Sequence, residues 1–261
     1  MQLLWSLSQN NMPDLQRFEE ACRAVSSGGR LLKGIGTESE KSVHAVLKNY
    51  YEPYHDSQEQ RIGGYIADIV GENGIIEIQT GHFSNLTEKL RAFLSVSRVT
   101  VVFPVFVKKR IVTLDGETGE VKSRRVSPLK ETAYDVFPNL FPIAEFLTNE
   151  NFSLTIVLLE ADELRAPPES IGRKKRRRNR LSVIDRIPTA MTDEITIESP
   201  RDWEKLIPCL FDEDYTTADL AEAAKISRQT ASAALSALFR GGVVRRTGKT
   251  GNAYTYRFSE H

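Results

Sequence analysis

Residues 65–80 read YIADIVGENGIIEIQT, in which two segments rich in Ile and Val flank the turn sequence GENG. Alternating side chains on either side of a short glycine-containing turn are typical of a β-hairpin. Two registers are open to this turn, one with Glu72 and Asn73 at its tip and one with Asn73 and Gly74 there. The sequence therefore predicts two adjacent antiparallel strands at this point of the chain.

Three polar side chains fall on one face of this hairpin. The first register places Asp68 opposite Glu77 and the second places it opposite Gln79, and in both all three share a face because side chains alternate along a strand. Like charges that face each other in a sheet repel and destabilise it. Two acids held together in strands rich in Ile and Val indicate a divalent cation between them. The alternative is that these acids are solvated or salt-bridged on an outer face.

The composition is that of a soluble globular protein. The 261 residues are 40% hydrophobic and 27% charged, which suits one large domain or a core domain with a smaller one. Lys+Arg and Asp+Glu balance at 35 each, so any binding to nucleic acid must come from local patches and not from the net charge.

No targeting signal is evident in the sequence. Cys22 and Cys209 lie far apart and match no metal-ligand spacing, which favours a reducing compartment. The longest apolar runs, such as residues 99–107, are too short to cross a bilayer, and the N-terminus lacks the features of a signal peptide. We expect a cytoplasmic protein with no membrane partner.

Helices and strands are predicted on both sides of the hairpin. The order of helix, three strands, helix and strand predicts an α/β fold with a mixed central sheet flanked by helices. A fully apolar stretch at 99–107 is typical of a strand buried on both faces. The predicted elements are a helix over 12–26, a helix that begins at Thr37 and ends before Pro53, strands over 55–62, 65–70 and 75–80, a helix over 85–94, a strand over 99–107, a projecting hairpin over 110–125, a helix around Ala144 and a final strand over 154–159.

The composition changes after the last of these strands. Pro167-Pro168 begins a predicted linker over 166–198, which separates a domain over 1–165 from a C-terminal domain over 199–261. A basic run within the linker can neutralise DNA phosphates without reading sequence, although such runs are also found as solvated linkers with no partner. Its predicted DNA contacts are Arg173, Lys174, Lys175, Arg176, Arg177 and Arg178.

The order of elements and acids over residues 37–107 resembles the PD-(D/E)xK nuclease superfamily. The resemblance implies a restriction-endonuclease-like fold in which Asp68 and Glu77 bind the metal. Glu40 would be the first-helix acid found in part of the superfamily, although it also fits a capping box with Thr37. Gln79 stands where the superfamily usually has lysine, a departure that some restriction enzymes share.

The chemistry of these residue types fits phosphodiester hydrolysis. Mg²⁺, or Mn²⁺ in its place, takes carboxylate oxygens, waters and phosphate oxygens, and the carbonyl of Ile78 could add a further oxygen. Gln79 can only hydrogen-bond to the attacking water, or is simply a polar residue beside the site. His82 or His44 could accept a proton.

The C-terminal region looks like a winged helix-turn-helix domain. Helices are predicted from Ser199-Pro200, over 217–225 and over 228–240, with Ser227 as the cap of the third, followed by a hairpin around 247–252. In such modules the third helix enters the major groove and the wing touches the backbone. Winged helices also serve as protein-docking modules. The predicted DNA contacts are Arg228, Gln229, Thr230, Arg245, Arg246 and Lys249.

These features together predict a metal-dependent DNA endonuclease with a DNA-binding module. A non-catalytic DNA-binding or regulatory protein on a degenerate nuclease scaffold is the chief alternative, because of Gln79. A protein-interaction role for both domains is the third. Homodimerisation would let two sites cut two strands, but nothing in the sequence specifies it.

Overall fold

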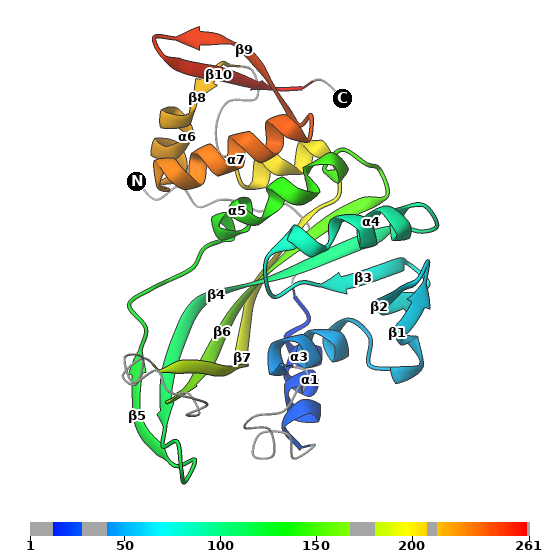
Figure 1. Cartoon of the computed structure of the whole chain (residues 1–261), viewed down its shortest axis with the longest axis vertical. Coiled ribbons are helices and arrows are strands. Elements are labelled where there is room, and N and C mark those ends of the chain that lie inside the picture. Colours follow the sequence, from blue (N-terminus) through cyan, green and yellow to red (C-terminus); the bar gives the residue numbers. More distant parts are fainter. Residues whose placement is uncertain (1–12, 28–40, 168–180, 208–212, 260–261) are drawn as a thin grey trace, which may run out of the picture.

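A seven-stranded mixed sheet forms the centre of the molecule (Figure 1). The computed structural model describes residues 13–27, 41–167, 181–207 and 213–259, and all counts of elements refer to these ranges. The sheet has the order β1-β2-β3-β4-β6-β7, with β5 paired to β4 outside this path. The elements of this part are α1 (Leu15–Ser27), α3 (Ser42–Tyr51), η1 (His55–Ser57), β1 (Gln58–Ile62), β2 (Tyr65–Gly71), β3 (Gly74–Ile78), η2 (Phe83–Asn85), α4 (Thr87–Leu94), β4 (Val99–Leu114), β5 (Val121–Val126), η3 (Ala133–Val136), α5 (Phe137–Leu140), η4 (Phe141–Phe146), β6 (Phe152–Ala166) and β7 (Ser182–Ile197).

The predicted hairpin is formed by β2 and β3. Val70 pairs with Ile75 and Gly71 with Gly74, which leaves Glu72 and Asn73 at the tip and confirms the first of the two registers. Gly74 has φ +117, and a Cβ there would lie 2.5 Å from the carbonyl oxygen of Arg98. The turn therefore needs glycine at this position to let the backbone pass against the start of β4.

The next strand, β4, runs parallel to β3, with Glu77 beside Val101. A parallel pair needs a crossover connection, and α4 supplies it. Residues Val101–Phe106 are buried, as the apolar run predicts for a strand covered on both faces. The mixed α/β architecture with flanking helices is thereby confirmed.

Helices cover both faces of the sheet (Figure 1). One hydrophobic cluster joins α1 and α3 to the face that carries Ile69, Ile78 and Val102. A second cluster lies on the opposite face, where α4 and the α5–η4 segment pack over Ile75 and Val101. The helix expected around Ala144 is the 3-10 segment η4, which follows the single turn α5. Thr37 and Glu40 lie outside the described residues, and α3 begins at Ser42.

The predicted linker is wrong over much of its length. Residues Ser182–Ile197 form β7, which pairs antiparallel with β6 from Leu154↔Ile197 to Ala166↔Ser182. The predicted strand 154–159 is correspondingly extended to Phe152–Ala166. β7 escaped prediction because it is an edge strand with mostly half-buried residues, and its pairing with β6 shifts register near Pro188. The basic run over 173–178 lies outside the described residues.

The C-terminal region forms a compact unit with its own small sheet. Within the described residues this sheet has three strands in the order β8-β10-β9, and α6 and α7 pack beside it (Figure 1). Ser199 caps its first segment through a capping box with Asp202, as predicted, although that segment is a 3-10 turn. The elements are η6 (Pro200–Lys205), β8 (Tyr215–Thr216), α6 (Thr217–Ala224), α7 (Arg228–Arg240), β9 (Val244–Thr250) and β10 (Ala253–Phe258).

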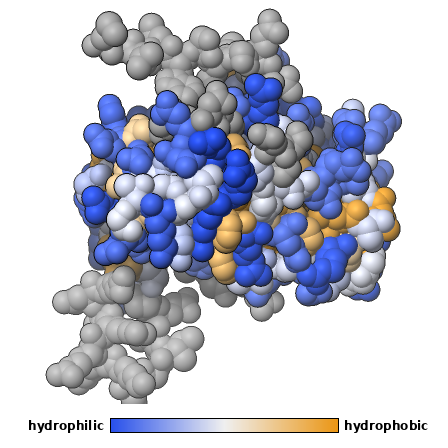
Figure 2. Space-filling model, turned by 90° about the horizontal axis from the view of Figure 1, so that it is seen from above, coloured by the Kyte–Doolittle hydropathy of each residue, from blue (hydrophilic) through white to orange (hydrophobic). Residues whose placement is uncertain are grey.

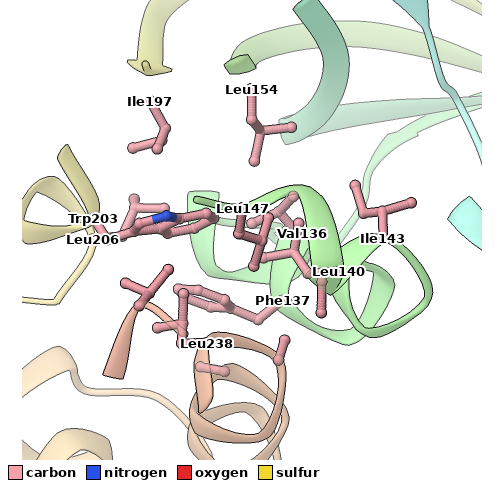
Figure 3. Close-up of a cluster of buried hydrophobic side chains, with 14 of the residues drawn as sticks. Val136, Phe137, Leu140, Ile143, Leu147, Leu154, Ile197, Trp203, Leu206 and Leu238 are labelled. Carbon is pink, nitrogen blue, oxygen red and sulfur yellow. The ribbon is translucent and has the colours of Figure 1, made fainter. Parts of the chain in front are cut away.

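This C-terminal unit shares its core with the main sheet. Phe137 of α5, Trp203 of η6 and Leu238 of α7 are all at most 1% exposed and belong to one cluster. In Figure 3, Phe137 lies between Leu238 of α7 and a group of side chains that ends with Leu154 and Ile197 of the sheet. Among the described residues, no helix is long and apolar enough to span a membrane.

Candidate functional site

The structure brings Asp68 and Glu77, here called the acid pair, together where the β2–β3 ladder ends. The last recorded pair of that ladder is Ile69↔Ile76. Beyond it, the carboxylate of Asp68 accepts a hydrogen bond from the backbone N–H of Ile78 at 2.8 Å, in place of a main-chain partner. The same oxygen, Oδ2, lies 3.2 Å from Nε2 of His44 on α3. Asp68 is thus held by one backbone donor and one imidazole.

Glu77 is the more deeply buried member of the acid pair. The residue is only 5% exposed. One of its oxygens, Oε1, forms an ion pair with the ammonium of Lys89 on α4. The other, Oε2, is buried and has no hydrogen-bond partner among the described residues. A buried acceptor of this kind calls for an explanation, and a missing ligand is one of the few available.

The electrostatics of the acid pair follow from its burial. Desolvation, followed by the negative charge of Asp68, raises the pKa of Glu77 from 4.5 to about 7, although Lys89 and the backbone N–H of Asp68 act in the opposite direction. A cation bound between the two carboxylates would offset both causes. A cation that bound there would compete with a proton for Glu77.

Gln79 and His82 lie in the loop that follows β3. The amide of Gln79 donates to the backbone carbonyl of His82 at 2.9 Å. His82 in turn places Nδ1 2.9 Å from Oδ1 of Asn139 on α5. No contact of His82 with the acid pair is recorded within the described ranges, whereas His44 contacts Asp68 directly. Of the two histidines considered from the sequence, the structure brings His44 to the acids.

Helix α3, which carries His44, is fastened to β7 at both ends. At its start, the backbone N–H of Ser42 donates to Asp185 at 3.2 Å. At its end, the hydroxyls of Tyr50 and Tyr51 both donate to Glu194, the first at 2.8 Å. Burial and the charge of Glu194 raise the pKa of both tyrosines. These bonds hold α3, and with it His44, against β7.

The residues present fit a hard cation that keeps most of its water. The described residues contain no cluster of three or more His, Cys, Asp or Glu side chains suited to a metal. Mg²⁺ does not need one, because it is usually bound through one or two carboxylates plus waters and substrate phosphates. Asp68 and the buried Oε2 of Glu77 supply two such oxygens. Glu40 lies outside the described residues.

Sequence reasoning missed Lys89. The lysine lies ten positions after Gln79, near the start of α4, the helix that connects β3 to β4, and its ammonium contacts Glu77. It also lies 5.5 Å from the ring centroid of Phe93, which helps to orient it. The sequence does contain a pattern that could have identified this lysine. Lys89 falls on the half-buried face of the helix that connects β3 to β4, and that face lies toward the end of β3.

The predicted contacts on α7 lie at its exposed N-terminus. Arg228 and Gln229 are exposed, while the hydroxyl of Thr230 lies 2.9 Å from that of Ser227, the N-cap residue. The exposed stripe of α7 continues along the helix beyond these residues. It is made of small or polar side chains that the sequence analysis did not single out, namely Ser232, Ser236 and Arg240.

The hairpin of β9 and β10 carries cations stacked on aromatic rings. The guanidinium of Arg246 lies 4.0 Å from the ring centroid of Tyr254 and 4.4 Å from that of Phe239 on α7. The ammonium of Lys249 lies 4.6 Å from the Tyr254 centroid. Arg245 is exposed on the same strand. These contacts order the cations on the surface beside the exposed stripe of α7.

A hollow in the surface lies away from the acid pair. It has a volume of about 560 Å³ and lies between α1 and the end of α3. Its lining includes Arg17, Asn49 and His55, and neither acid contributes to it. The chemistry of the acid pair therefore does not depend on this hollow.

Comparison with known proteins gives the chain a family. A family model described as a domain of unknown function (DUF8091) matches residues 41–198, which run from the start of α3 to the end of β7 and include His44, the acid pair and Lys89. An uncharacterized protein of Treponema pallidum (strain Nichols) is 29% identical over 153 residues, which are 58% of this chain and 59% of that protein. The chain thus spans less than two thirds of that relative's length. No solved structure matches. Because the match covers more than half of its residues, the chain belongs to the DUF8091 family.

Proposed function

We propose that the protein is a Mg²⁺- or Mn²⁺-dependent endonuclease that hydrolyses phosphodiester bonds in DNA. The observation that carries this proposal is the carboxylate of Glu77, which is buried beside Asp68 and whose Oε2 has no hydrogen-bond partner in the described part of the chain. Burying a carboxylate oxygen without a partner costs free energy. The negative charges of Asp68 and Glu77 also repel each other. A cation bound between them would offset both unfavourable effects.

The order of elements supports a restriction-endonuclease-like domain. Helix α3, the antiparallel strands β1 to β3, helix α4 and the parallel strand β4 follow one another as in the PD-(D/E)xK resemblance. Asp68 lies on the second of these strands and Glu77 on the third. The acids thus occupy the strands that the resemblance assigns to metal binding.

Asp68 and Glu77 would hold the metal ion, with the carbonyl of Ile78 as a further oxygen nearby. When bound, such an ion lowers the pKa of a water molecule and stabilises negative charge on the leaving oxygen. The backbone N–H of Ile78 fixes one oxygen of Asp68. That bond orients the carboxylate before any ligand arrives, which reduces the cost of ordering it later.

Lys89 would replace the lysine that the PD-(D/E)xK motif usually carries at the position of Gln79. Its ammonium already contacts Glu77, so it brings a positive charge to the place where a phosphate would be attacked. Gln79 is one strand position beyond Ile78 and can accept a hydrogen bond from water through its side-chain oxygen. His44, whose Nε2 lies 3.2 Å from Oδ2 of Asp68, is positioned to orient that carboxylate.

The C-terminal unit would bind the DNA as a winged helix-turn-helix module. The exposed stripe of α7 begins with Arg228 and Gln229 and continues through Ser232 and Ser236 to Arg240. Small serines allow a helix to approach base edges closely, and cations at both ends suit the flanking phosphates. Figure 2, which views the molecule from the side of this unit, shows a mainly hydrophilic surface, as expected for a nucleic-acid partner.

The β9–β10 hairpin would act as the wing. Arg245, Arg246 and Lys249 are exposed on it, and stacking on Tyr254 and Phe239 holds Arg246 in one orientation. Cations that are ordered in advance lose less entropy when they meet a phosphate backbone. The basic run at 173–178 would add contacts that carry no sequence information.

The test is a cleavage assay with isosteric variants. We expect the wild-type protein to nick or cut supercoiled plasmid, or one of a set of duplex, single-stranded and branched oligonucleotides, with Mg²⁺ or Mn²⁺ but not with EDTA. Asp68→Asn and Glu77→Gln should each lower the rate by about 10³-fold, since each removes a metal ligand. Both variants should keep salt-dependent DNA binding. Cleavage that survives in the double variant, or that never occurs in any metal, would contradict the proposal.

A non-catalytic DNA-binding role is the second candidate, and Gln79 favours it. The side chain there is an amide engaged with its own loop, at the position where the superfamily usually has lysine. Such a protein would bind DNA equally well in EDTA and in Mg²⁺, and it would cleave none of the substrates. Either function is expected of a cytoplasmic protein, and sedimentation on DNA would reveal whether it acts as a homodimer.

A further inference from the structure

The C-terminal unit is seated firmly on the main sheet, on the face that carries Glu77. The rings of Phe137 and Trp203 lie 5.9 Å apart between the two parts, and Leu238 of α7 packs against them (Figure 3). Ile75 and Val101, which share the Glu77 face, belong to the same continuous cluster. The unit is thus an extension of the main core, in contrast to a domain that hangs on a flexible tether.

The end of α7 touches the main domain backbone to backbone. A Cβ at Gly241, directly after the helix, would lie only 2.5 Å from the carbonyl oxygen of Ala144 in η4 and 3.0 Å from the side chain of Leu147. Glycine alone permits this approach. Such a contact leaves little room for α7 to slide or tilt on η4.

A polar bridge joins the same interface to the loop that follows Glu77. From Gln79, two positions beyond Glu77, a hydrogen bond leads to the carbonyl of His82. The imidazole of His82 lies 2.9 Å from Asn139 on α5, and Asn139 donates to the carbonyl of Asp135 at 3.2 Å. Since α5 packs directly against α7, the loop beside the acids and the proposed DNA-reading helix rest on one support.

We infer that DNA held by α7 passes the acid pair in a single register, so that one phosphate at a fixed offset from the bound segment is presented for hydrolysis. This inference rests on the proposed function and specifies its substrate geometry. Two domains joined by a flexible linker would instead sample many offsets. A shared core and a backbone contact remove that freedom.

The probe is a set of duplexes retained from a randomised library by the full-length Asp68→Ala protein in EDTA. Their α7 footprint is defined as the protection that disappears in the double variant Arg228→Ala, Gln229→Ala. Wild-type protein with Mg²⁺ is then expected to cut each strand at one offset from this footprint, within one or two nucleotides. Cuts scattered over a helical turn, about 10 bp, would overturn the inference.

A second measurement does not depend on the protein's own activity. Ser84 is exposed in η2, next to the loop of Gln79. An iron–EDTA reagent on Ser84→Cys, in a chain with Cys22→Ser and Cys209→Ser, should cleave the retained duplexes by hydroxyl radicals in one short patch. A ladder along the whole duplex would overturn the inference. A single patch from the tethered reagent without any metal-dependent cutting would leave the register intact and refute the hydrolase.

The interface itself is tested with two alanine substitutions of glycine. Gly241→Ala should force α7 away from Ala144 and broaden the tethered patch at least two-fold, while the α7 footprint is kept. Gly116→Ala is the matched control, because a Cβ there meets only Pro167 at an ordinary 3.5 Å. It should leave the patch unchanged. If Gly241→Ala does not fold, Asn139→Ala breaks the polar bridge instead and should broaden the patch. An unchanged narrow patch in every interface variant that folds would overturn the claim that this interface sets the register.

Discussion

Glu77 and Glu163 are both buried glutamates of the same sheet, yet their surroundings differ in one respect. Glu163 on β6 is 2% exposed, and each of its oxygens is bound by an arginine. Glu77 on β3 is 5% exposed and has one lysine at Oε1. Its Oε2 has no hydrogen-bond partner in the part of the chain that the structure describes, although the backbone N–H of Asp68 lies near the carboxylate. The two side chains are buried to nearly the same extent, but Glu163 has a charged donor at each oxygen and Glu77 has one at only one oxygen.

The pKa values of the two carboxyls move in opposite directions for this reason. Burial opposes ionisation of Glu163, but hydrogen bonds from Arg186 and Arg165 outweigh it and lower its pKa. At Glu77, burial and the nearby charge of Asp68 outweigh the effect of Lys89, and the pKa rises to about 7. A buried acid is structural when its donors are complete and available for a ligand when they are not.

The largest effect should come from removing the satisfied carboxylate. Glu163→Gln leaves two arginines beside a neutral amide, and we expect it to lower the free energy of unfolding by about 3 kcal/mol, at the low end because both arginines are partly exposed. Glu77→Gln, the matched variant, is neutral at every pH and should instead raise the free energy of unfolding at pH 7.5, by up to about 2 kcal/mol, because it removes a carboxylate whose ionised form is disfavoured by burial. Urea denaturation in EDTA at pH 7.5 measures both. Equal losses would mean that the two sites are both structural.

Lys89 should matter for chemistry more than for folding. Lys89→Met leaves Glu77 without its cation, so the pKa of Glu77 should rise further and metal binding should weaken. We expect the cleavage rate at pH 7.5 to fall about 100-fold, with partial recovery in Lys89→Arg.

A matched lysine variant separates this effect from a general loss of charge. Lys108 forms a surface ion pair with Glu160 at 2.9 Å on the same sheet. Lys108→Met should therefore change cleavage less than two-fold. A similar loss in both variants would show that Lys89 has no special place at the acid pair.

Local patterns in the sequence predicted the hairpin well. The turn GENG and the alternation around it define the β2–β3 register as far as Ile69↔Ile76. Beyond that pair the expected shared face is not kept, because Asp68 contacts His44 on α3 whereas Glu77 contacts Lys89 on α4. The caps at Ser199 and Ser227 were also evident, because a cap depends on a few neighbouring residues.

Long-range pairing set the limit of prediction. β7 is stabilised by pairing with β6 and by the carboxylates that hold α3, and neither feature leaves an apolar run in its own sequence. Lys89 and His44 reach the acids from two helices on opposite faces of the sheet, 12 and 24 positions away from their partners in the chain. Their role became visible only once the packing of both helices was known.

The pH dependence of stability should distinguish the two glutamates. The folded pKa of Glu77, about 7, lies above its ordinary 4.5, so its contribution to stability is fully present below pH 4.5 and is lost as the pH rises through 7. Between pH 5 and 8 in EDTA we expect a loss of about 2 kcal/mol that is absent in Glu77→Gln. Chemical denaturation at several pH values measures this slope.

Magnesium should reverse the same loss. Because a proton and a cation compete for Glu77, the stabilisation by Mg²⁺ should grow from pH 6 to pH 8. Thermal shift with and without Mg²⁺ checks this. A pH-independent shift, or the same shift in Glu77→Gln, would place the ion elsewhere.

Glu194 is the intermediate case and should give the smallest effect. Its two donors are the neutral hydroxyls of Tyr50 and Tyr51, where Glu163 has two cations and Glu77 has one. Neutral donors stabilise a carboxylate less than charged ones, so Glu194→Gln should lower the free energy of unfolding by only about 1 kcal/mol. Glu198→Gln, at an exposed position on the same segment, is the control and should cause no measurable loss of stability.

Because Glu194 holds the end of α3, its replacement should also let His44 shift relative to Asp68, and cleavage should fall a few-fold although no reacting group has changed. A loss of stability without any change in cleavage would show that the position of His44 is set by Asp185 and the hydrophobic contacts of α3 alone.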